Sequence, residues 1–434
     1  MRLNYKRTFF IGLAFMSISA FWQMYDNVIP LMLKKTFGLG ETLTGVLMAM
    51  DNVLALFLLP LFGAISDRVN TRLGKRTPFI LVGTALAVIS MTFIPSANQE
   101  ANLTLFVILL AVVLVSMGTY RSPAVALMPD LTPKPLRSKA NAIINLMGAL
   151  GGAYTLGMTM LFVYEGTDYR MIFLSISALM VVAVVFLVIM IRERKLSDGM
   201  AAGAEEIHTT ENRKKAQKGE QESQVTEAGD MSGDVKRSFL FLLASIFLWF
   251  TAYNAVTTAY SRYVEQVWNL ETGSYADSLL IAMIAAIISF IPIGFIASNI
   301  GRKKTILAGI LLMTVSYFCG SLFNHYTFLI NIVFALTGIG WAAINVNSYP
   351  MVVEMCKGSD IGKYTGLYYT FSMSAQILTP ILSGALLEFV SYRTLFPYAV
   401  IFSIASLCTM LFVKHGDSRP VRKKELLENY DTPD

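Results

Sequence analysis

Twelve long apolar runs, separated by polar segments, make up most of the chain. A helix needs about 20 apolar residues to cross the hydrocarbon core of a bilayer, and each run is close to this length. No alternation of polar and apolar positions, which would indicate strands, competes for these segments. The backbone must satisfy its own hydrogen bonds inside a bilayer, so we expect helices. The expected spans are residues 8–33, 42–66, 78–95, 103–128, 139–163, 170–191, 238–262, 276–298, 304–322, 326–350, 361–387 and 394–413.

One long hydrophilic segment divides these runs into two sets of six. Residues 192–237 are rich in Glu, Lys, Gln, Gly and Ser and contain few apolar residues. A segment of this composition buries too little surface to order itself. We therefore expect a six-helix bundle over residues 1–191, a flexible linker over 192–237, a second six-helix bundle over 238–413 and a tail over 414–434.

A short charged loop follows the second run of each half. Residues 63–76 combine one acid and four bases with two glycines, and residues 294–304 form a less complete copy. The fourth run of each half ends beside an acid, Asp130 in the first and Glu354 in the second. Repeated bundles of this kind commonly enclose a substrate site near the bilayer midplane. The repeat predicts an all-α integral membrane protein in which two six-helix bundles form a transport pathway.

The composition and the charge distribution agree with a membrane protein. Charged residues make up 15% of the chain, against roughly a quarter in soluble domains, and the mean hydropathy is +0.56. The net charge of +6 does not indicate a nucleic-acid partner, because 29 of the 35 Lys and Arg residues lie at the two ends or in alternate loops. This positive-inside pattern predicts cytoplasmic termini, and we expect a multi-pass protein of the plasma membrane.

Residues for enzymatic or metal chemistry are scarce. Neither a nucleophile with a base nor a phosphate-binding loop is present, so we expect no enzyme activity and no cofactor. The three cysteines follow neither a disulfide framework nor a metal spacing. All histidines lie outside the expected spans, which leaves Asp and Glu to carry any protons. The cysteines are Cys319, Cys356 and Cys408, and the histidines are His208, His325 and His415.

Three ionisable side chains stand out because they lie away from the ends of the expected spans: Asp26, Asp51 and Arg121. Such groups are costly inside the hydrocarbon and mark function by default. Helical rise places Asp26 and Asp51 at similar depths on neighbouring spans. Two carboxylates so placed favour sharing one proton, as a proton-coupling site requires. Alternatively, Asp51 bonds locally to Asn52 and only stabilises helix packing.

Arg121 is a candidate for substrate binding, because its planar guanidinium suits a carboxylate or paired sugar hydroxyls. The alternative is an arginine that extends towards the cytoplasmic headgroups. Further polar or aromatic candidates for substrate binding lie along the first span at helical spacing, and one lies in the fifth span. These candidates are Trp22, Gln23, Asn27 and Asn145.

The second half offers neutral polar groups instead of deep carboxylates. Aromatic rings stack on the apolar faces of sugars, and amides both donate and accept hydrogen bonds. As a group they favour an uncharged, polar substrate, although each could equally hold helices together. The candidates are Tyr253, Asn254, Trp341, Asn345 and Gln376.

The charged loop itself is a candidate for gating. Asp67 lies at a helix end, where it could pair with Arg68, Arg72 or a neighbouring helix. Asp130 and Glu354, at the ends of the fourth spans, are candidate partners at the same level.

These loops resemble the hallmark of the major facilitator superfamily, which follows the second and eighth spans. The first loop continues into Thr77-Pro-Phe-Ile80, a form similar to that of the sucrose–proton symporters and their bacterial relatives. The stretch Arg121-Ser-Pro-Ala124, with Asp130 and the later Ala140-Asn-Ala142, also resembles that group. The resemblance implies a proton-coupled disaccharide importer in which Arg121 contacts the sugar.

The neighbouring glycoside–pentoside–hexuronide symporters share the longer loop. Their sodium-dependent members carry two acids in the second span, at positions that here hold Ala55 and Leu59. The resemblance therefore favours protons over sodium as the coupling ion.

We expect a secondary active sugar symporter that works by alternating access as a monomer. The alternatives are a proton-coupled exporter of drugs or metabolites and a non-transporting membrane sensor on the same fold.

Overall fold

The computed structural model describes residues 4–132, 137–163, 168–194, 196, 233–355 and 361–417, and nearly all of them are helical. Twelve described helices are long and apolar enough to cross a membrane, which confirms the predicted all-α fold with twelve spans. The long helices are α1 (Tyr5–Lys35), α2 (Glu41–Arg68), α3 (Thr77–Gln99), α4 (Leu103–Asp130), α5 (Arg137–Phe162), α6 (Arg170–Met190), α8 (Gly233–Trp268), α9 (Tyr275–Ile300), α10 (Arg302–Ser321), α11 (Leu329–Glu354), α12 (Ile361–Phe389) and α13 (Leu395–Leu411).

Most helix ends lie within a few residues of their expected positions, and α8 differs most. It begins at Gly233 and ends at Trp268, whereas the apolar run covers only residues 238–262. Its first turn contains Asp234, an acid that is favourable at a helix N-terminus. Polar residues thus extend the helix beyond the apolar run, and residues 233–237 belong to α8 rather than to the linker. Residues 197–232 of the linker and 418–434 of the tail lie outside the described residues.

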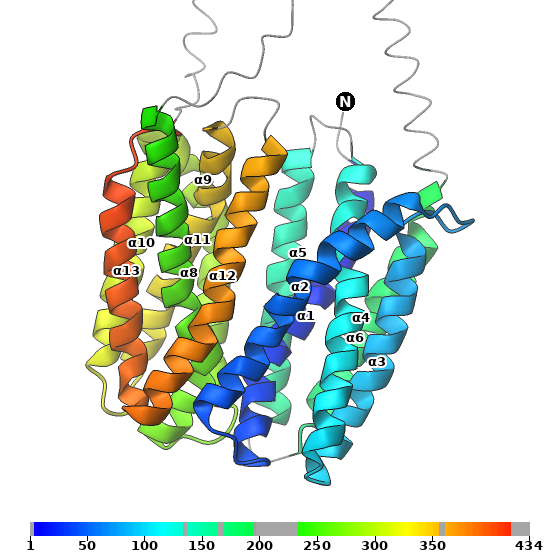
Figure 1. The fold of residues 1–434 in the computed structure, drawn as a ribbon, viewed down its shortest axis with the longest axis horizontal. Helices are drawn as coiled ribbons and strands as arrows, with labels where there is room; N and C mark the ends of the chain where they lie inside the picture. Colours follow the sequence, from blue (N-terminus) through cyan, green and yellow to red (C-terminus); the bar gives the residue numbers. More distant parts are fainter. Residues whose placement is uncertain are drawn as a thin grey trace, which may run out of the picture. The chain divides into compact units, whose positions relative to one another are not determined.

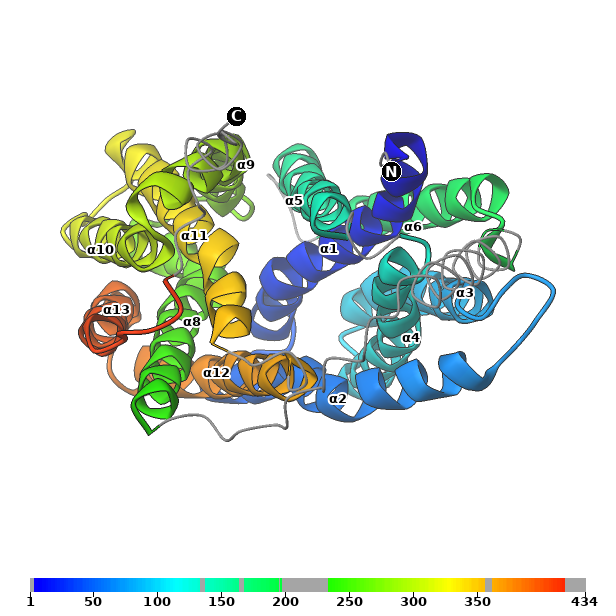
Figure 2. The same ribbon diagram turned by 90° about the horizontal axis from the view of Figure 1, so that it is seen from above.

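The first compact unit contains α1 to α6 together with residues 264–277. Within it, α1 packs against α5 and α6, α3 packs against α4 and α6, and α2 packs against α4 (Figures 1 and 2). Apolar side chains such as Phe21, Met117 and Phe173 form its buried core. An ion pair of 3.0 Å joins Lys35 Nζ to Glu265 Oε1 within this unit.

The second compact unit contains α8 as far as Tyr263, α9 from Ser278 onwards, and α10 to α13. Here α10 packs against α11 and α13, and α12 packs against both α11 and α13 (Figure 2). The contact between α10 and α11 corresponds to that between α3 and α4 in the first unit. Both depend on glycine: a Cβ added at Gly83 would lie 2.9 Å from the Ser116 carbonyl oxygen, and one at Gly309 would lie 2.8 Å from that of Gly340.

Helices α1 and α5 approach each other closely at Gly151, and a substitution there tests how tightly the first unit is packed. A Cβ at Gly151 of α5 would lie 2.0 Å from the carbonyl oxygen of Met16 in α1, whereas one at Gly157 would meet nothing within 4 Å. We expect Gly151→Ala to destabilise the protein by about 1–3 kcal/mol through overpacking. Thermal unfolding in detergent measures the change. Gly157→Ala is the matched control, and equal melting temperatures for the two variants would contradict the close contact.

Candidate functional site

The polar residues of the first span lie on α1 among aromatic side chains. The Trp22 ring contacts Phe21 and Tyr25 edge-on, with centroids 4.9 and 5.5 Å away. Its Nε1 atom is buried and has no hydrogen-bond partner among the described residues. Asp26 lies one turn further along the same helix and is half-buried. The indole and the carboxylate therefore occupy neighbouring positions on one face of α1.

Arg121 of α4 reaches this face of α1. Its guanidinium carbon lies 5.6 Å from the centroid of the Trp22 ring, a cation–π distance. The charge of Arg121 acts on both Asp26 and Asp51, and the charge of Asp51 acts on Asp26. Helices α1, α2 and α4 thus bring together four of the residues singled out in the sequence. We call Trp22, Asp26, Asp51 and Arg121 the charged cluster.

Asp51 also makes the local hydrogen bond to Asn52 that was expected if this acid only stabilises helix packing. Its Oδ1 atom accepts a hydrogen bond of 2.7 Å from Asn52 Nδ2. This bond occupies one carboxylate oxygen and orients the side chain, and it does not remove the charge from the cluster. The two interpretations of Asp51 are therefore compatible.

The remaining candidates of the first unit lie differently. Asn27 is 2% exposed, and its Nδ2 atom donates to the Gln23 carbonyl oxygen of its own helix at 2.9 Å. Gln23 is half-buried on α1, while Asn145 is exposed on α5. The amide of Asn27 thus helps to satisfy α1 itself.

In the second unit, an aromatic group forms around Trp341 of α11. The Tyr253 ring of α8 stacks on it with centroids 5.8 Å apart and planes inclined by 23°, and the Phe290 ring of α9 lies at 5.9 Å. Asn254 Nδ2 donates to the Phe250 carbonyl oxygen at 2.8 Å, and Gln376 Nε2 donates to that of Ser372 at 3.3 Å. The rings therefore come together, while these amide nitrogens bond within their own helices.

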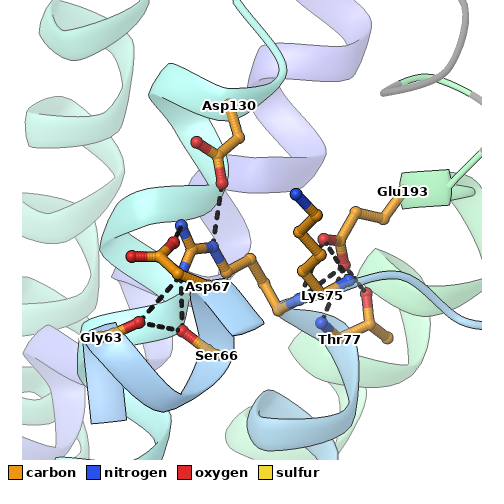
Figure 3. A network of polar contacts seen from close by, with 8 residues as sticks. Gly63, Ser66, Asp67, Lys75, Thr77, Asp130 and Glu193 are labelled. Atoms are coloured by element: carbon orange, nitrogen blue, oxygen red, sulfur yellow. Dashed lines mark hydrogen bonds and ion pairs between the residues drawn. The ribbon is translucent and has the colours of Figure 1, made fainter. Parts of the chain in front are cut away.

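The charged loop of the first unit is organised around Arg76, which precedes α3. Its Nε atom donates to Asp130 Oδ2 at 2.9 Å, and its Nη2 atom donates to Asp67 Oδ1. Its Nη1 atom donates to Ser66 Oγ and to the Gly63 carbonyl oxygen. Figure 3 shows Asp67 and Asp130, from α2 and α4, on either side of this bonding. We call Ser66, Asp67, Arg76 and Asp130 the inner network.

The partner of Asp67 differs from the loop residues expected for it. Arg68 and Arg72 are exposed, whereas Arg76 is only 6% exposed. The reason is the turn closed by the pair Thr71 and Gly74, after which the chain enters α3 beside α4. Arg68 and Arg72 were expected as partners because they lie nearest to Asp67 in the sequence. Gly74, which takes part in the turn, was the sequence signal that could have pointed to Arg76.

A carboxylate that was not singled out in the sequence holds the start of α3. Glu193 accepts hydrogen bonds from the backbone N–H groups of Lys75 at 2.8 Å, Arg76 at 2.9 and 3.1 Å, and Thr77 at 2.8 Å. It also accepts one from the Thr77 hydroxyl at 2.7 Å (Figure 3). The first N–H groups of a helix have no partner within the helix. Glu193 satisfies them from a position beyond α6, 116 residues away from Thr77.

The second unit has a related arrangement at the start of α10. Arg302 pairs with Glu354, the last residue of α11. The N–H of Lys303 donates to Asp417 Oδ1 at 3.1 Å. Glu354 thus pairs with a base at the start of the third helix of its unit, as Asp130 does in the first.

The chain matches the Major Facilitator Superfamily model over residues 11–291 and 268–429. It is 24% identical over 199 residues to an uncharacterised MFS-type transporter of Mycobacterium tuberculosis, covering 45% of this chain and 28% of that protein. It is 30% identical over 146 residues to the sucrose transport protein SUT3 of Oryza sativa subsp. indica, covering 29% of each. The matches thus span less than a third of the length of these curated relatives.

Solved structures share the fold at low sequence identity. A POT family transporter in complex with 5-aminolevulinic acid superimposes with a TM-score of 0.69 at 11% identity, over 94% of this chain and 95% of that one. The xylose transporter XylE from E. coli, in an inward-open conformation, gives 0.66 at 14% identity over 98% of each chain. The likeness shows the twelve-helix fold alone. Together with the family match over both halves, it leads to one conclusion: the chain belongs to the major facilitator superfamily of membrane transporters.

Proposed function

We propose that this transporter is a secondary active symporter that works by alternating access. It carries a proton together with a sugar, which is either a disaccharide or a glycoside. The observation that carries the proposal is the charged cluster, in which one guanidinium acts on two carboxylates within the spans. The similarity to a sucrose transport protein over 146 residues supports the sugar. The fold shared with a xylose transporter is compatible with it.

The cluster provides groups for both solutes. The guanidinium of Arg121 offers planar donors that suit a pair of vicinal hydroxyls. Asp26 and Asp51 carry two negative charges against one positive charge, so a single proton on the pair leaves the cluster neutral. In the proposed mechanism this proton weakens the hold of the carboxylates on Arg121, which then binds the sugar. Proton binding thereby promotes sugar binding.

Aromatic residues of the second unit are also proposed to contact the sugar. The rings of Tyr253 and Trp341 present apolar faces of the kind that pack on sugar rings. Gln23, Asn27, Asn145, Asn254, Asn345 and Gln376 remain proposed as polar contacts to the hydroxyls. The inner network and the pair of Arg302 with Glu354 are proposed to gate one end of the pathway.

We further propose that the ends carrying these ion pairs face the cytoplasm and that the protein resides in the plasma membrane as a monomer. The concentration of Lys and Arg in the loops at these ends supports the orientation. One chain contains both six-helix units, so one chain suffices for a complete pathway.

A proton flux assay with the wild-type protein tests this function. Vesicles containing the oriented transporter and an internal pH indicator are exposed to a panel of mono- and disaccharides, with and without a sodium gradient. We expect one group of sugars to acidify the vesicle interior without any need for sodium. Silence with every sugar, in vesicles shown to hold folded protein, would contradict sugar symport. Proton entry driven by a drug or metabolite loaded inside the vesicles, which would leave in exchange for the proton, would favour the alternative, a proton-coupled exporter.

A further inference from the structure

The start of α3 depends on a side chain from elsewhere in the first unit. Its N-cap residue, Arg76, provides no side-chain hydrogen bond to the helix. Glu193 takes this role with two carboxylate oxygens that accept from four donors. Glu193 is 4% exposed, so these bonds replace the hydration of its carboxylate almost completely.

A glycine makes room for this carboxylate. Gly74 has a φ of +120°, and a Cβ there would lie 2.3 Å from Glu193 Oε2. Any other residue would therefore both strain the backbone and displace the acid. Leu196, close behind Glu193, packs against the core of the unit. The segment that leaves α6 is thus held at Glu193 and at Leu196.

The second unit repeats this arrangement with different residues. The N-cap of α10 is Gly301, which has a φ of +97° and no side chain to cap the helix. A Cβ there would lie 2.8 Å from Asp417 Oδ1, the atom that accepts from the Lys303 N–H. Asp417 follows the last helix of its unit, α13, as Glu193 follows α6.

The segment that carries Asp417 is also fixed by neighbouring helices. Ser238 of α8 accepts the N–H of Lys414 at 2.8 Å and bonds to His415 Nδ1 at 3.0 Å. Lys303 Nζ donates to the Leu411 carbonyl oxygen at 3.0 Å. A Cβ at Gly416 would lie 2.9 Å from the carbonyl oxygen of Met351 in α11.

Each cap lies directly beside an ion pair proposed to gate the pathway. In the first unit, the N–H of Arg76 is held by Glu193 while its guanidinium bonds to Asp67 and Asp130. In the second, the charge of Asp417 acts on Arg302, which pairs with Glu354. The carboxylate therefore fixes the backbone from which the basic side chain extends.

We propose that Glu193 and Asp417 are equivalent positioning residues that hold the base at the start of the third helix against the acid that ends the fourth helix. Each carboxylate lies on the segment that leaves the sixth helix of its unit. Displacement of that segment releases the helix start, and with it the ion pair. The segment after each sixth helix thus controls the gate of its own unit. Its importance for transport rests on the proposed function, whereas its effect on the ion pairs does not.

Hydrogen–deuterium exchange of the full-length protein in lipid nanodiscs tests the proposal without a substrate. Glu193→Gln leaves one acceptor oxygen in place of two and turns an N–H₂ group towards N–H donors. We expect exchange at residues 75–77 to rise about 10-fold or more, because bonds to a charged acceptor are lost. Exchange at the end of α4, residues 126–130, is expected to rise as well, since Arg76 loses its position.

A double variant separates positioning from simple capping. If Glu193 acts through Arg76 and Asp130, adding Asp130→Asn to Glu193→Gln produces no further rise at the end of α4. Thr77→Val, which removes only the hydroxyl donor, is expected to give a smaller change at the same residues. It provides the test if Glu193→Gln does not fold. Glu100→Gln, an exposed acid at the opposite end of α3, is the matched control and should change neither region.

The second unit must respond in the same way. Asp417→Asn is expected to raise exchange at residues 302–305 and at the end of α11, residues 351–354. A rise confined to the helix start in either unit would reduce the acid to a cap and overturn the proposal. No change at either place would also overturn it. If exchange rises as expected but no sugar moves protons, the positioning role stands and only the proposed function is contradicted.

Discussion

Arg121→Lys is expected to reduce the apparent sugar affinity for sugar-driven proton entry about 10- to 100-fold. The estimate corresponds to the loss of one charge-assisted hydrogen-bonded contact, about 1.5–3 kcal/mol. Lysine keeps the positive charge but lacks the planar fork that fits paired hydroxyls. It also loses the contact of the guanidinium with the Trp22 ring, whose centroid lies 5.6 Å from the guanidinium carbon in the wild-type protein. Sugar-dependent acidification of vesicles, followed over a range of sugar concentrations, measures the change.

Arg237→Lys is the matched control for this variant. Arg237 also lies over an aromatic ring, with its guanidinium carbon 5.8 Å from the centroid of Phe241, but it is exposed near the start of α8. We expect its replacement to leave proton entry close to the wild-type rate. Wild-type affinity in Arg121→Lys would show that only the charge at this position matters, and the proposed contact with sugar hydroxyls would be wrong.

Asp26→Asn is expected to separate sugar movement from proton movement. Asparagine is nearly isosteric with a protonated aspartic acid and cannot exchange a proton. The variant should therefore retain sugar exchange across the membrane, measured as counterflow of a labelled sugar, and lose sugar-driven acidification. Permanent neutralisation leaves Asp51 as the only carboxylate to balance Arg121 in the charged cluster. The cluster then stays neutral without a proton, which is the physical basis of the expected uncoupling.

Counterflow and acidification also identify the results that would contradict a coupling role for Asp26. Equal loss of counterflow and of acidification would make Asp26 a binding or structural residue rather than a coupling residue. Unchanged acidification would remove it from the proton pathway altogether. Asp168→Asn, an exposed acid whose carboxylate caps the N–H of Arg170, is the control for the substitution itself and should retain both activities.

The sequence predicted the helices well because the bilayer leaves the backbone few choices. An apolar run of span length must be helical wherever it lies in hydrocarbon. The largest departures, at the two ends of α8, occur where polar residues continue the helix outside the apolar run. Hydropathy marks where the solvent changes, and helix propensity and capping decide where the helix ends.

The charged cluster could be predicted in part. The cost of burial singled out Asp26, Asp51 and Arg121 individually. Their interaction depends on how α1, α2 and α4 pack, which no local pattern contains. The amides of Asn254 and Gln376 show the reverse case. Both looked available for a ligand, and their nitrogens bond to carbonyls of their own helices.

The inner network shows why charge runs are difficult to interpret. All four bases of the loop are equally compatible with the positive-inside pattern. The turn at Thr71 and Gly74 decides which of them is buried against the neighbouring helices. Glu193 was even less accessible to sequence reasoning, because it lies in a hydrophilic segment and bonds to residues more than a hundred positions earlier. Its role follows from tertiary packing alone.

The distance between Glu193 and α3 has a consequence for the order in which the protein is made. Ribosomes synthesise the chain from its N-terminus, so α3 and α4 are complete before Glu193 has been added, 116 residues after Thr77. Until then, the first N–H groups of α3 must be satisfied by water or by headgroups. Nascent chains that end before α6 are therefore left with an open helix start. Completion of α6 and its following segment is the step that closes the start of α3 during biogenesis.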